Sequence, residues 1–307
     1  MQQIRKPGSM KKQLPLLIIS IPGLAYLLIN NYIPMMGVFI AFKKLDYGKG
    51  IFRSDWIGFR NFEFLFKTND AFIMVRNTLL YNLTFIILGT ICAVFIAILM
   101  AEVSKMFCSR IFQAGLILPN LVSMVIVAYL VYAFLTPETG FVNTTVLPAF
   151  GMPGINWYSE AKYWPFILVI VQSWKTAGYS SIVYIANIAG IDQELYEAAV
   201  IDGAGKLRQI FSITIPMLKP TIIIMVLMSI GRIFSSDFGL FYQVPMNSGA
   251  LYNVTQTIDT YVYRGLMRLG DVGMSSAAGL FQSVVGFTLV MGANAIVRKV
   301  SNENALF

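Results

Sequence analysis

Residues 197–220 read EAAVIDGAGKLRQIFSITIPMLKP, a polar stretch of mixed charge inside a strongly apolar second half of the chain. Good helix formers run from Glu194 to Ile201, and Asp202-Gly203 then breaks the helical pattern. Apolar side chains return at helical spacing from Leu207 to Ile213, and two prolines are expected to end this second helix. The stretch predicts a helical hairpin that a soluble partner could grip while its two ends pull on membrane helices.

The composition indicates that lipid is the solvent of most of this chain. Of its 307 residues 57% are hydrophobic and only 12% are charged, too apolar for a soluble domain of this size. The net charge of +8 is scattered at the ends of apolar runs, which argues against nucleic-acid binding. The chain has no His, which excludes Ser-His triads and His-based zinc sites, and its two cysteines, Cys92 and Cys108, make no disulfide framework.

Six stretches are apolar and long enough to cross a bilayer, which takes about 20 residues of helix. They are residues 14–42, 78–101, 112–135, 163–188, 221–240 and 274–297. The expected fold is an all-α polytopic membrane protein with six transmembrane helices in residues 14–297. The polar hairpin forms a loop at 194–220, and short tails lie at 1–13 and 298–307.

The first apolar run follows four basic residues but is too long for a signal peptide, so it indicates an uncleaved span that starts in the cytoplasm. Both tails are then cytoplasmic. The basic residues support this orientation only weakly, because the first outer loop also carries Lys and Arg. In that loop, residues 55–66 interleave aromatic and charged side chains, a pattern typical of a segment that lies at the lipid headgroups.

Two cations lie inside predicted spans, where a buried charge is costly and indicates a functional site by default. Lys175 follows Trp164 by eleven residues and Arg232 follows Thr221 by eleven, about 16 Å along a helix in each case. Both are therefore near the middle of an apolar layer of about 30 Å.

Polar neighbours at helical spacing extend each cation into a stripe. With one nearby aromatic residue, the two stripes predict a substrate path of Gln172, Trp174, Lys175, Tyr179, Ser229, Arg232 and Ser236. Two roles fit the charges. Both could contact an anionic substrate; alternatively, Arg232 pairs with Asp237 or with an acid of a partner chain, and Lys175 bonds to a backbone carbonyl.

No catalytic or nucleotide-binding motif is present. Gly205-Lys206 is not part of a P-loop, because Val200 stands where the first Gly is needed and Leu207 stands where Ser or Thr is needed. Arg208 likewise replaces the third Gly of a dinucleotide-binding loop. Any energy for transport must therefore come from another chain.

The hairpin resembles the EAA loop of the membrane subunits of binding-protein-dependent ATP-binding-cassette importers. That pattern is Glu-Ala-Ala, three residues, Gly, nine residues, Ile, one residue, Leu-Pro. The matching positions are Glu197, Ala198, Ala199, Gly203, Ile213 and Pro216, with Ile215 in place of Leu, and Asp202, Ala204 and Phe211 fit the carbohydrate branch. Tyr32, Pro34 and Gly37 before the first outer loop also fit, so the resemblance covers nearly the whole chain.

The resemblance implies a type I importer permease with the MetI-like fold, in the inner membrane of a bacterium, of the branch that takes up oligosaccharides and complex polysaccharides. It implies a second, homologous permease, two ATPase subunits and an extracytoplasmic solute-binding protein as partners. ATP and Mg would bind to the ATPases, so this chain needs no cofactor and is no enzyme. If Lys175 and Arg232 both line the path, an acidic oligosaccharide such as a uronate fits better than a neutral one, and an acid of the second permease is the other candidate partner of Arg232. The branch itself does not identify the sugar, nor does it show whether the ATPase is dedicated or shared.

The resemblance also implies an ATPase-coupling role for Glu197, Ala198, Ala199, Asp202, Gly203, Ile213 and Pro216. Small alanines let the helix approach a groove on the ATPase, the Glu offers a carboxylate, and Gly203 turns the chain without a Cβ penalty. For Asp202, a local turn or cap role is as well supported as partner contact.

Two other classes of protein remain as alternatives. A secondary transporter driven by an ion gradient would need carboxylates within its spans, and only Asp237, near one end, comes close. A membrane-bound enzyme is disfavoured by the absent His and by the lack of paired carboxylates in a span.

Overall fold

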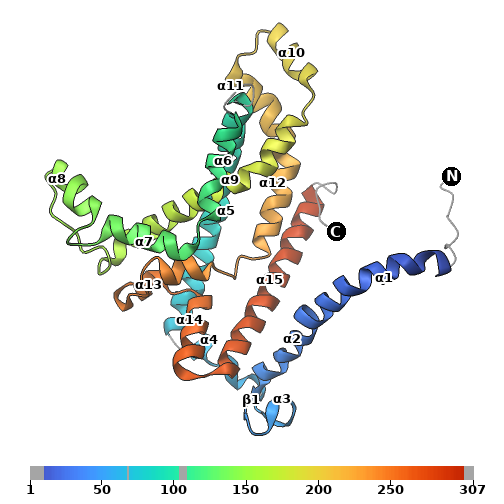
Figure 1. Cartoon of the computed structure of the whole chain (residues 1–307), viewed down its shortest axis with the longest axis vertical. Helices are drawn as coiled ribbons and strands as arrows, with labels where there is room; N and C mark the ends of the chain where they lie inside the picture. Colours follow the sequence, from blue (N-terminus) through green and yellow to red (C-terminus); the bar gives the residue numbers. More distant parts are fainter. Residues whose placement is uncertain (1–9, 68, 104–108, 301–307) are drawn as a thin grey trace.

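The computed structural model describes residues 10–67, 69–103 and 109–300, and nearly all of this part of the chain is helical (Figure 1). Its centre is α5 (Asn69–Val103), which packs along α9 (Trp164–Ala189). Small residues allow that close approach, since Ala93 and Ala97 of α5 are buried against Tyr184 and Ile188 of α9. Three helices complete the bundle: α6 (Ser109–Leu121), α12 (Ile215–Ile230) and α15 (Val272–Val300).

The first span leaves the bundle as an arm (Figure 1). It consists of α1 (Met10–Leu27), the π-turn η1 (Leu28–Tyr32), α2 (Ile33–Met35) and the 3-10 helix η2 (Met36–Phe42). At its far end η2 packs against α15, whereas most side chains before it are exposed. A hairpin of two short antiparallel strands, β1 (Lys43–Lys44) and β2 (Asp55–Trp56), follows.

Four π-turns in this structure each end two residues before a proline. Proline cannot donate to the carbonyl four residues earlier, and its ring clashes with that carbonyl in an α-helix. The clashing carbonyl belongs each time to the middle residue of the π-turn, whose wider spiral makes room for the ring. The pairs are Leu28–Tyr32 with Pro34, Val142–Val146 with Pro148, Ile210–Thr214 with Pro216, and Gly239–Gln243 with Pro245.

The sequence prediction that Pro216 and Pro220 end the second helix of the hairpin was wrong, because a π-turn before Pro216 lets the helix continue. The chain continues from α11 (Lys206–Gln209) through η6 (Ile210–Thr214) into α12 as one helical run, Lys206–Ile230. Pro216 lies in the first turn of α12, where its missing N–H costs little. The predicted span 221–240 was wrong at both ends, because the helix starts earlier and stops at Ile230.

The predicted span 112–135 is a bent pair of helices and not one straight helix. α6 ends at Leu121, α7 (Met124–Leu135) begins at Met124, and the two helices meet at 93°. Pro119 weakens the last turn of α6, and the extended residue Ser123 caps α7 by accepting a hydrogen bond from the Ile126 N–H at 3.4 Å.

Four helical runs of the described chain are long and apolar enough to cross a membrane, or five with the bent α6–α7 pair as one span, where the sequence predicted six. They are Ile18–Phe42, Asn69–Val103, Lys206–Ile230 and Val272–Lys299. α9 has the length of a span, with 26 residues, but Gln172, Lys175 and Asn187 make it more polar than the others.

Short elements connect these helices, several of them toward the end of the molecule opposite α10 (Figure 1). Asn77 of α5 holds the last loop there, since its Nδ2 donates to the carbonyls of Asn253 and Gln256 at 3.1 and 2.9 Å. The connecting elements are α3 (Gly50–Arg53), η3 (Gly58–Phe62), α4 (Phe64–Lys67), α8 (Leu147–Ala149), η5 (Ala161–Tyr163), η8 (Gly249–Leu251), α13 (Tyr252–Thr255), α14 (Ile258–Arg264) and η9 (Gly265–Leu269).

The packing of α6 on α9 depends on Gly178, because a Cβ at this position would lie 1.9 Å from the carbonyl oxygen of Leu116. We expect Gly178→Ala to force the helices apart and to destabilise the protein by about 1–3 kcal/mol. A thermal melt of the detergent-solubilised protein measures the loss. Gly115→Ala, on α6 with open space around its Cβ, is the matched control. Equal melting temperatures for both variants would contradict this account of the packing.

Candidate coupling hairpin and central cavity

The predicted hairpin forms one tip of the molecule (Figure 1). Its first helix, α10 (Gln193–Ile201), starts at Asp192, whose side chain accepts a hydrogen bond from the Glu194 N–H at 3.0 Å. The helix ends at Asp202, and Gly203 then adopts a φ of +77°, a conformation that glycine enters without a Cβ penalty. Asp202 thus occupies the C-cap position of α10, and its contact with a partner stays a prediction.

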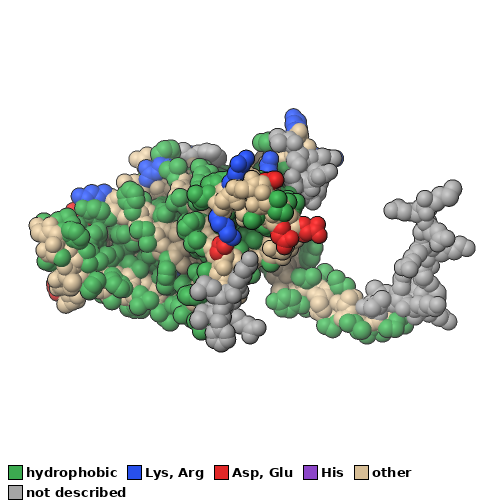
Figure 2. Space-filling view, turned by 90° about the horizontal axis from the view of Figure 1, so that it is seen from above, with side chains coloured by type: hydrophobic (Ala, Val, Ile, Leu, Met, Phe, Trp, Pro, Cys, Tyr) green, Lys and Arg blue, Asp and Glu red, His purple; other side chains and the backbone are tan. Residues whose placement is uncertain are grey.

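Most side chains at the tip are exposed. Glu197, Ala198, Asp202, Gly203 and Pro216 are exposed, whereas Ala199 and Ile213 are half-buried. Large apolar side chains lie among them, with Ile201 85% and Leu207 72% exposed. Figure 2 looks down on this end and shows acidic and basic side chains beside apolar ones. The coupling residues are thus accessible to a partner, while their role in coupling stays a prediction.

Polar contacts tie the hairpin to the membrane helices. The Lys206 Nζ lies 3.0 Å from the carboxylate of Glu102 at the end of α5. The hydroxyls of Tyr196 and Thr214 are 2.9 Å apart and join α10 to η6. Gln209 is buried and donates its Nε2 hydrogen to the Ala204 carbonyl at 3.0 Å. The contacts of these residues could not be predicted from the sequence. Lys206 and Glu102, for example, lie 104 residues apart in the chain.

A second candidate site is a cavity of about 540 Å³ between α5, α9 and α12. Four of the seven predicted path residues line it: Gln172, Ser229, Arg232 and Ser236. Asn82, Thr90, Thr176, Ser180 and Asp237 add polar groups to the same wall. The cavity lies just past the end of α12, where residues 231–238 form turns.

No acid of the described residues forms an ion pair with the cation in this cavity. Arg232 is exposed, and no ion pair of the described residues includes it. The carboxylate of Asp237, its suggested partner, instead accepts the Leu240 N–H at 3.0 Å and caps η7 (Gly239–Gln243). The buried Oε1 of Gln172 has no hydrogen-bond partner in the part of the chain that the structure describes. The cavity thus offers a cation and a free acceptor to a polar guest.

Lys175 has a different role from Arg232. Its Nζ donates to the carbonyls of Pro119 and Asn120 at 3.3 and 3.2 Å and also to the carbonyl of Val122. These are carbonyls that the break between α6 and α7 leaves without helical partners. All three N–H groups are engaged, so of the two roles considered from the sequence the structure supports the backbone bond. Trp174 and Tyr179, which are 49% and 57% exposed, do not line the cavity either.

The rim of the cavity is bound to the last loop of the bundle. The Ser236 N–H donates to the Asp259 carboxylate at 2.7 Å, and the Ser236 hydroxyl lies 2.8 Å from the same oxygen. Thr257, fully buried, is 2.7 Å from that hydroxyl. On the cavity side, Asn82 donates its Nδ2 hydrogens to the carbonyls of Ile233 and Ser235 at 3.0 and 3.1 Å.

The loop itself is rigid around Arg264. Its guanidinium donates to the side-chain oxygens of Asn247 at 3.0 Å and of Gln256 at 3.2 Å, and it lies 4.1 Å from the ring centre of Tyr252. Burial lowers the pKa of Arg264 from its usual value. The described residues contain no group of three His, Cys, Asp or Glu side chains that could hold a metal ion.

Apolar helices around a polar cavity, with an exposed helical hairpin at one end, define a membrane permease. Residues 85–302 match the family described as binding-protein-dependent transport system inner membrane component. The chain belongs to this family. The match confirms the family and the all-α permease fold that the sequence predicted.

Similar proteins cover almost the whole chain. Protein LplB of Bacillus subtilis (strain 168) is 36% identical over 296 residues, which is 96% of this chain and 92% of that protein. The polygalacturonan/rhamnogalacturonan transport system permease protein YteP of the same organism is 33% identical over 94% of this chain and 89% of its own length. These names describe the two relatives and not this chain.

A solved structure has the same fold. It is a crystal structure of a bacterial ABC transporter involved in the import of the acidic polysaccharide alginate, with a TM-score of 0.86 and 31% identity over 95% of this chain and 98% of that chain. A second crystal structure shows a bacterial alginate transporter in complex with an alginate pentasaccharide-bound periplasmic protein, with a TM-score of 0.85 and 30% identity over 95% of this chain and 96% of that one.

The structural role of Lys175 can be tested by removing its charge. We expect Lys175→Met to leave three carbonyls at the α6–α7 break without a donor and to destabilise the solubilised protein by about 1–3 kcal/mol. Lys175→Arg keeps a cationic donor and should lose less. Thermal melts without sugar measure both variants. A Met variant as stable as the wild type would show that the bonds to the break contribute nothing.

The turn at Gly203 can be tested against a neighbouring glycine. We expect Gly203→Val to be strained, because a φ of +77° is unfavourable by about 1–2 kcal/mol for a residue with a Cβ. Gly205→Val is the matched control, since Gly205 has a φ of −69° and equally open surroundings. Nucleotide hydrolysis stimulated by the binding protein should fall in the Gly203 variant of the assembled importer and persist in the control. Equal loss in both would contradict a special role of this turn.

Proposed function

We propose that this chain is the permease subunit of an ATP-driven importer that moves an acidic oligosaccharide from an extracytoplasmic solute-binding protein into the cytoplasm. The observation that carries the proposal is Arg232, an unpaired cation in a polar cavity at the end of a membrane helix. A charge at such depth is costly unless a guest or partner neutralises it. A carboxylate on the sugar supplies that counter-charge, and a neutral sugar does not.

The comparisons support a sugar as cargo. A transporter of the same fold is described as importing the acidic polysaccharide alginate, and a relative is named for polygalacturonan and rhamnogalacturonan. The cavity of about 540 Å³ has hydroxyl and amide groups on several sides, which suits the hydroxyl groups of a sugar. With Lys175 engaged by carbonyls, Arg232 alone carries the preference for acid in this proposal.

The partners in this proposal are a second, homologous permease, two ATPase subunits and the solute-binding protein. The neighbouring structure in complex with a sugar-loaded periplasmic protein supports the last of these. The ATPases hold ATP and Mg, and this chain performs no catalysis. Their closure moves α10, and the pair of Lys206 with Glu102 passes the movement to α5. Hairpin and tails face the cytoplasm of a bacterial cell, and α13 and α14 face outward.

The residues of the cavity disfavour the alternative, a secondary transporter driven by an ion gradient. Such a transporter needs a carboxylate that can exchange a proton or hold a cation along the path. Asp237 is the one acid that lines this cavity, and its carboxylate already caps η7. An ATP-driven importer needs no acid at this place.

The preference for acidic sugars can be tested by removing the charge of Arg232. In the importer reconstituted with its partners, we expect Arg232→Gln to reduce uptake of a uronate oligosaccharide about tenfold or more, as for loss of a charge-assisted hydrogen bond of about 1.5–3 kcal/mol. A neutral oligosaccharide is the control cargo, and its uptake by the variant is compared with its uptake by the wild type. Arg232→Lys is the control variant, because it keeps the charge. Unchanged uptake of the uronate would contradict the role of Arg232. Uptake that continues without ATP would contradict the importer itself.

A further inference from the structure

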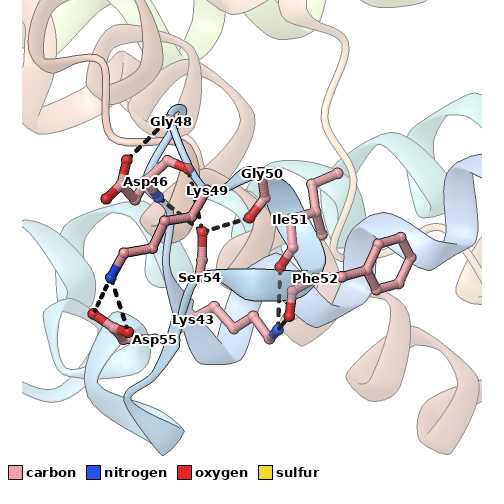
Figure 3. Close-up of polar contacts among 9 residues, drawn as sticks. All are labelled: Lys43, Asp46, Gly48, Lys49, Gly50, Ile51, Phe52, Ser54 and Asp55. Carbon is pink, nitrogen blue, oxygen red and sulfur yellow. Dashed lines mark hydrogen bonds and ion pairs between the residues drawn. The ribbon is translucent and has the colours of Figure 1, made fainter.

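The hairpin that follows the first span is a small, rigid platform (Figure 3). The short helix α3 lies between its two strands in the sequence. The Nζ of Lys43, in β1, donates to the carbonyls of Ile51 and Phe52 in α3 at 3.1 and 2.7 Å. Ser54 is buried, and its Oγ accepts the Asp46 N–H at 3.0 Å. Lys49 pairs with Asp55 at 3.3 Å. Together these bonds fix the backbone of the hairpin.

One residue fastens this platform to the bundle. Asn61 donates its Nδ2 hydrogens to the carbonyls of Ile40, Ala41 and Lys43 at 3.2, 3.0 and 3.0 Å. A Cβ on Gly273 of α15 would lie 2.7 Å from the same amide nitrogen. The platform is thus held where the first span ends and α15 begins.

The platform holds aromatic side chains out of the protein. Phe42 stacks on Trp56 with a centroid distance of 5.5 Å and meets Phe59 edge to face at 5.4 Å. Trp56 is nevertheless 63% and Phe59 75% exposed. The candidate span ends at Phe42, so these rings lie one strand from the boundary of the apolar layer. Aromatic rings at this level prefer the headgroup region of a bilayer.

An apolar groove runs from this platform along the bundle. It has a volume of about 700 Å³ and is lined by Ile57, Phe59, Arg60, Phe62, Glu63, Leu65 and Phe281. Phe281 follows Val272 by nine residues, about 14 Å along α15, so the groove extends from the headgroup level into the apolar layer.

The charge at the mouth of the groove is positive. Arg60 is exposed and forms no ion pair among the described residues. The carboxylate of Glu63, also at the groove, is held by Lys67 at 2.6 Å; Lys67 and, to a smaller extent, the charge of Arg60 lower the pKa of Glu63. Residues 43–60 carry five cations and two carboxylates. The platform therefore has an excess of positive charge, and the guanidinium of Arg60 has no ion pair among the described residues that would keep it from an anion.

We propose that this groove is a binding site for an anionic phospholipid, with the phosphate on Arg60 and an acyl chain against Phe62 and Phe281. One molecule then satisfies both features, an anionic head and an apolar tail. The level of the groove favours lipid over a protein segment, because the candidate span ends directly before the platform. Trp56 and Phe59 lie at the headgroups beside the bound lipid and fix the height of the first span. This proposal holds for any cargo of the transporter.

The test uses the complete importer, purified with its partner subunits and incubated with an equimolar mixture of phosphatidylglycerol and phosphatidylethanolamine. Native mass spectrometry then measures which lipid stays bound. We expect the wild type to retain phosphatidylglycerol selectively, Arg60→Gln to lose that selectivity about tenfold, and Arg60→Lys to keep most of it. Arg53→Gln, on α3 and outside the groove, is the matched control. Free glycerol phosphate should displace none of the bound lipid, which separates a lipid site from a phosphate site.

A second variant tests the groove without changing the charge. We expect Phe281→Trp to fill the groove and to reduce phosphatidylglycerol retention while Arg60 remains in place. Equal retention of both lipids by the wild type, or unchanged selectivity in Arg60→Gln, overturns the proposal. Disulfide cross-linking of a Phe59→Cys variant to a cysteine on the partner permease or the solute-binding protein also overturns it, because a protein would then occupy this surface.

Discussion

Where a helix breaks at membrane depth, the freed carbonyl groups need hydrogen-bond donors from the protein itself, because lipid offers none. In the described chain the helical path is interrupted between α6 and α7, beside α9, and again after α12. At both places side chains from other helices supply the donors. Lys175 serves the end of α6 at the first break. At the second, Asn82 donates to Ile233 and Ser235, and Gln282 donates to Phe234 at 2.8 Å. The breaks are stable because side-chain donors form hydrogen bonds with the carbonyl groups that each break leaves free.

The second break creates the cavity. Had α12 continued as a helix beyond Ile230, residues 231–238 would have formed about two more helical turns, with Arg232 on a regular helix. Instead the turns expose Arg232 and Ser236 at the cavity. Since Asn82 and Gln282 satisfy the local carbonyls, Arg232 is not needed as a cap. Two cations at similar depth therefore have different roles. Lys175 bonds to free backbone carbonyls, whereas the carbonyls near Arg232 already have other donors.

The sequence predicted what depends on local pattern. It gave the hairpin, its glycine turn and the family, because these rest on residue types at fixed spacing. Four of the seven residues of the predicted path line one cavity, since helical spacing determines which side chains share a face, while their role as a path stays a prediction. It could not separate Lys175 from Arg232, because the carbonyls that bind Lys175 lie 53 to 56 residues away in the sequence and no local pattern shows that Arg232 lacks such partners.

The errors at prolines have a single cause, and it bears on how the protein works. Proline was taken as an end of helix, whereas a π-turn before Pro216 lets the helix continue. The resulting run of 25 residues, Lys206–Ile230, is about 38 Å long and is one rod. One end lies in the exposed hairpin and the other stops two residues before Arg232. A helix that ended at the prolines would put a hinge between hairpin and cavity and would absorb a push from outside. A continuous rod instead carries a displacement of the hairpin directly to the residues around the proposed cargo.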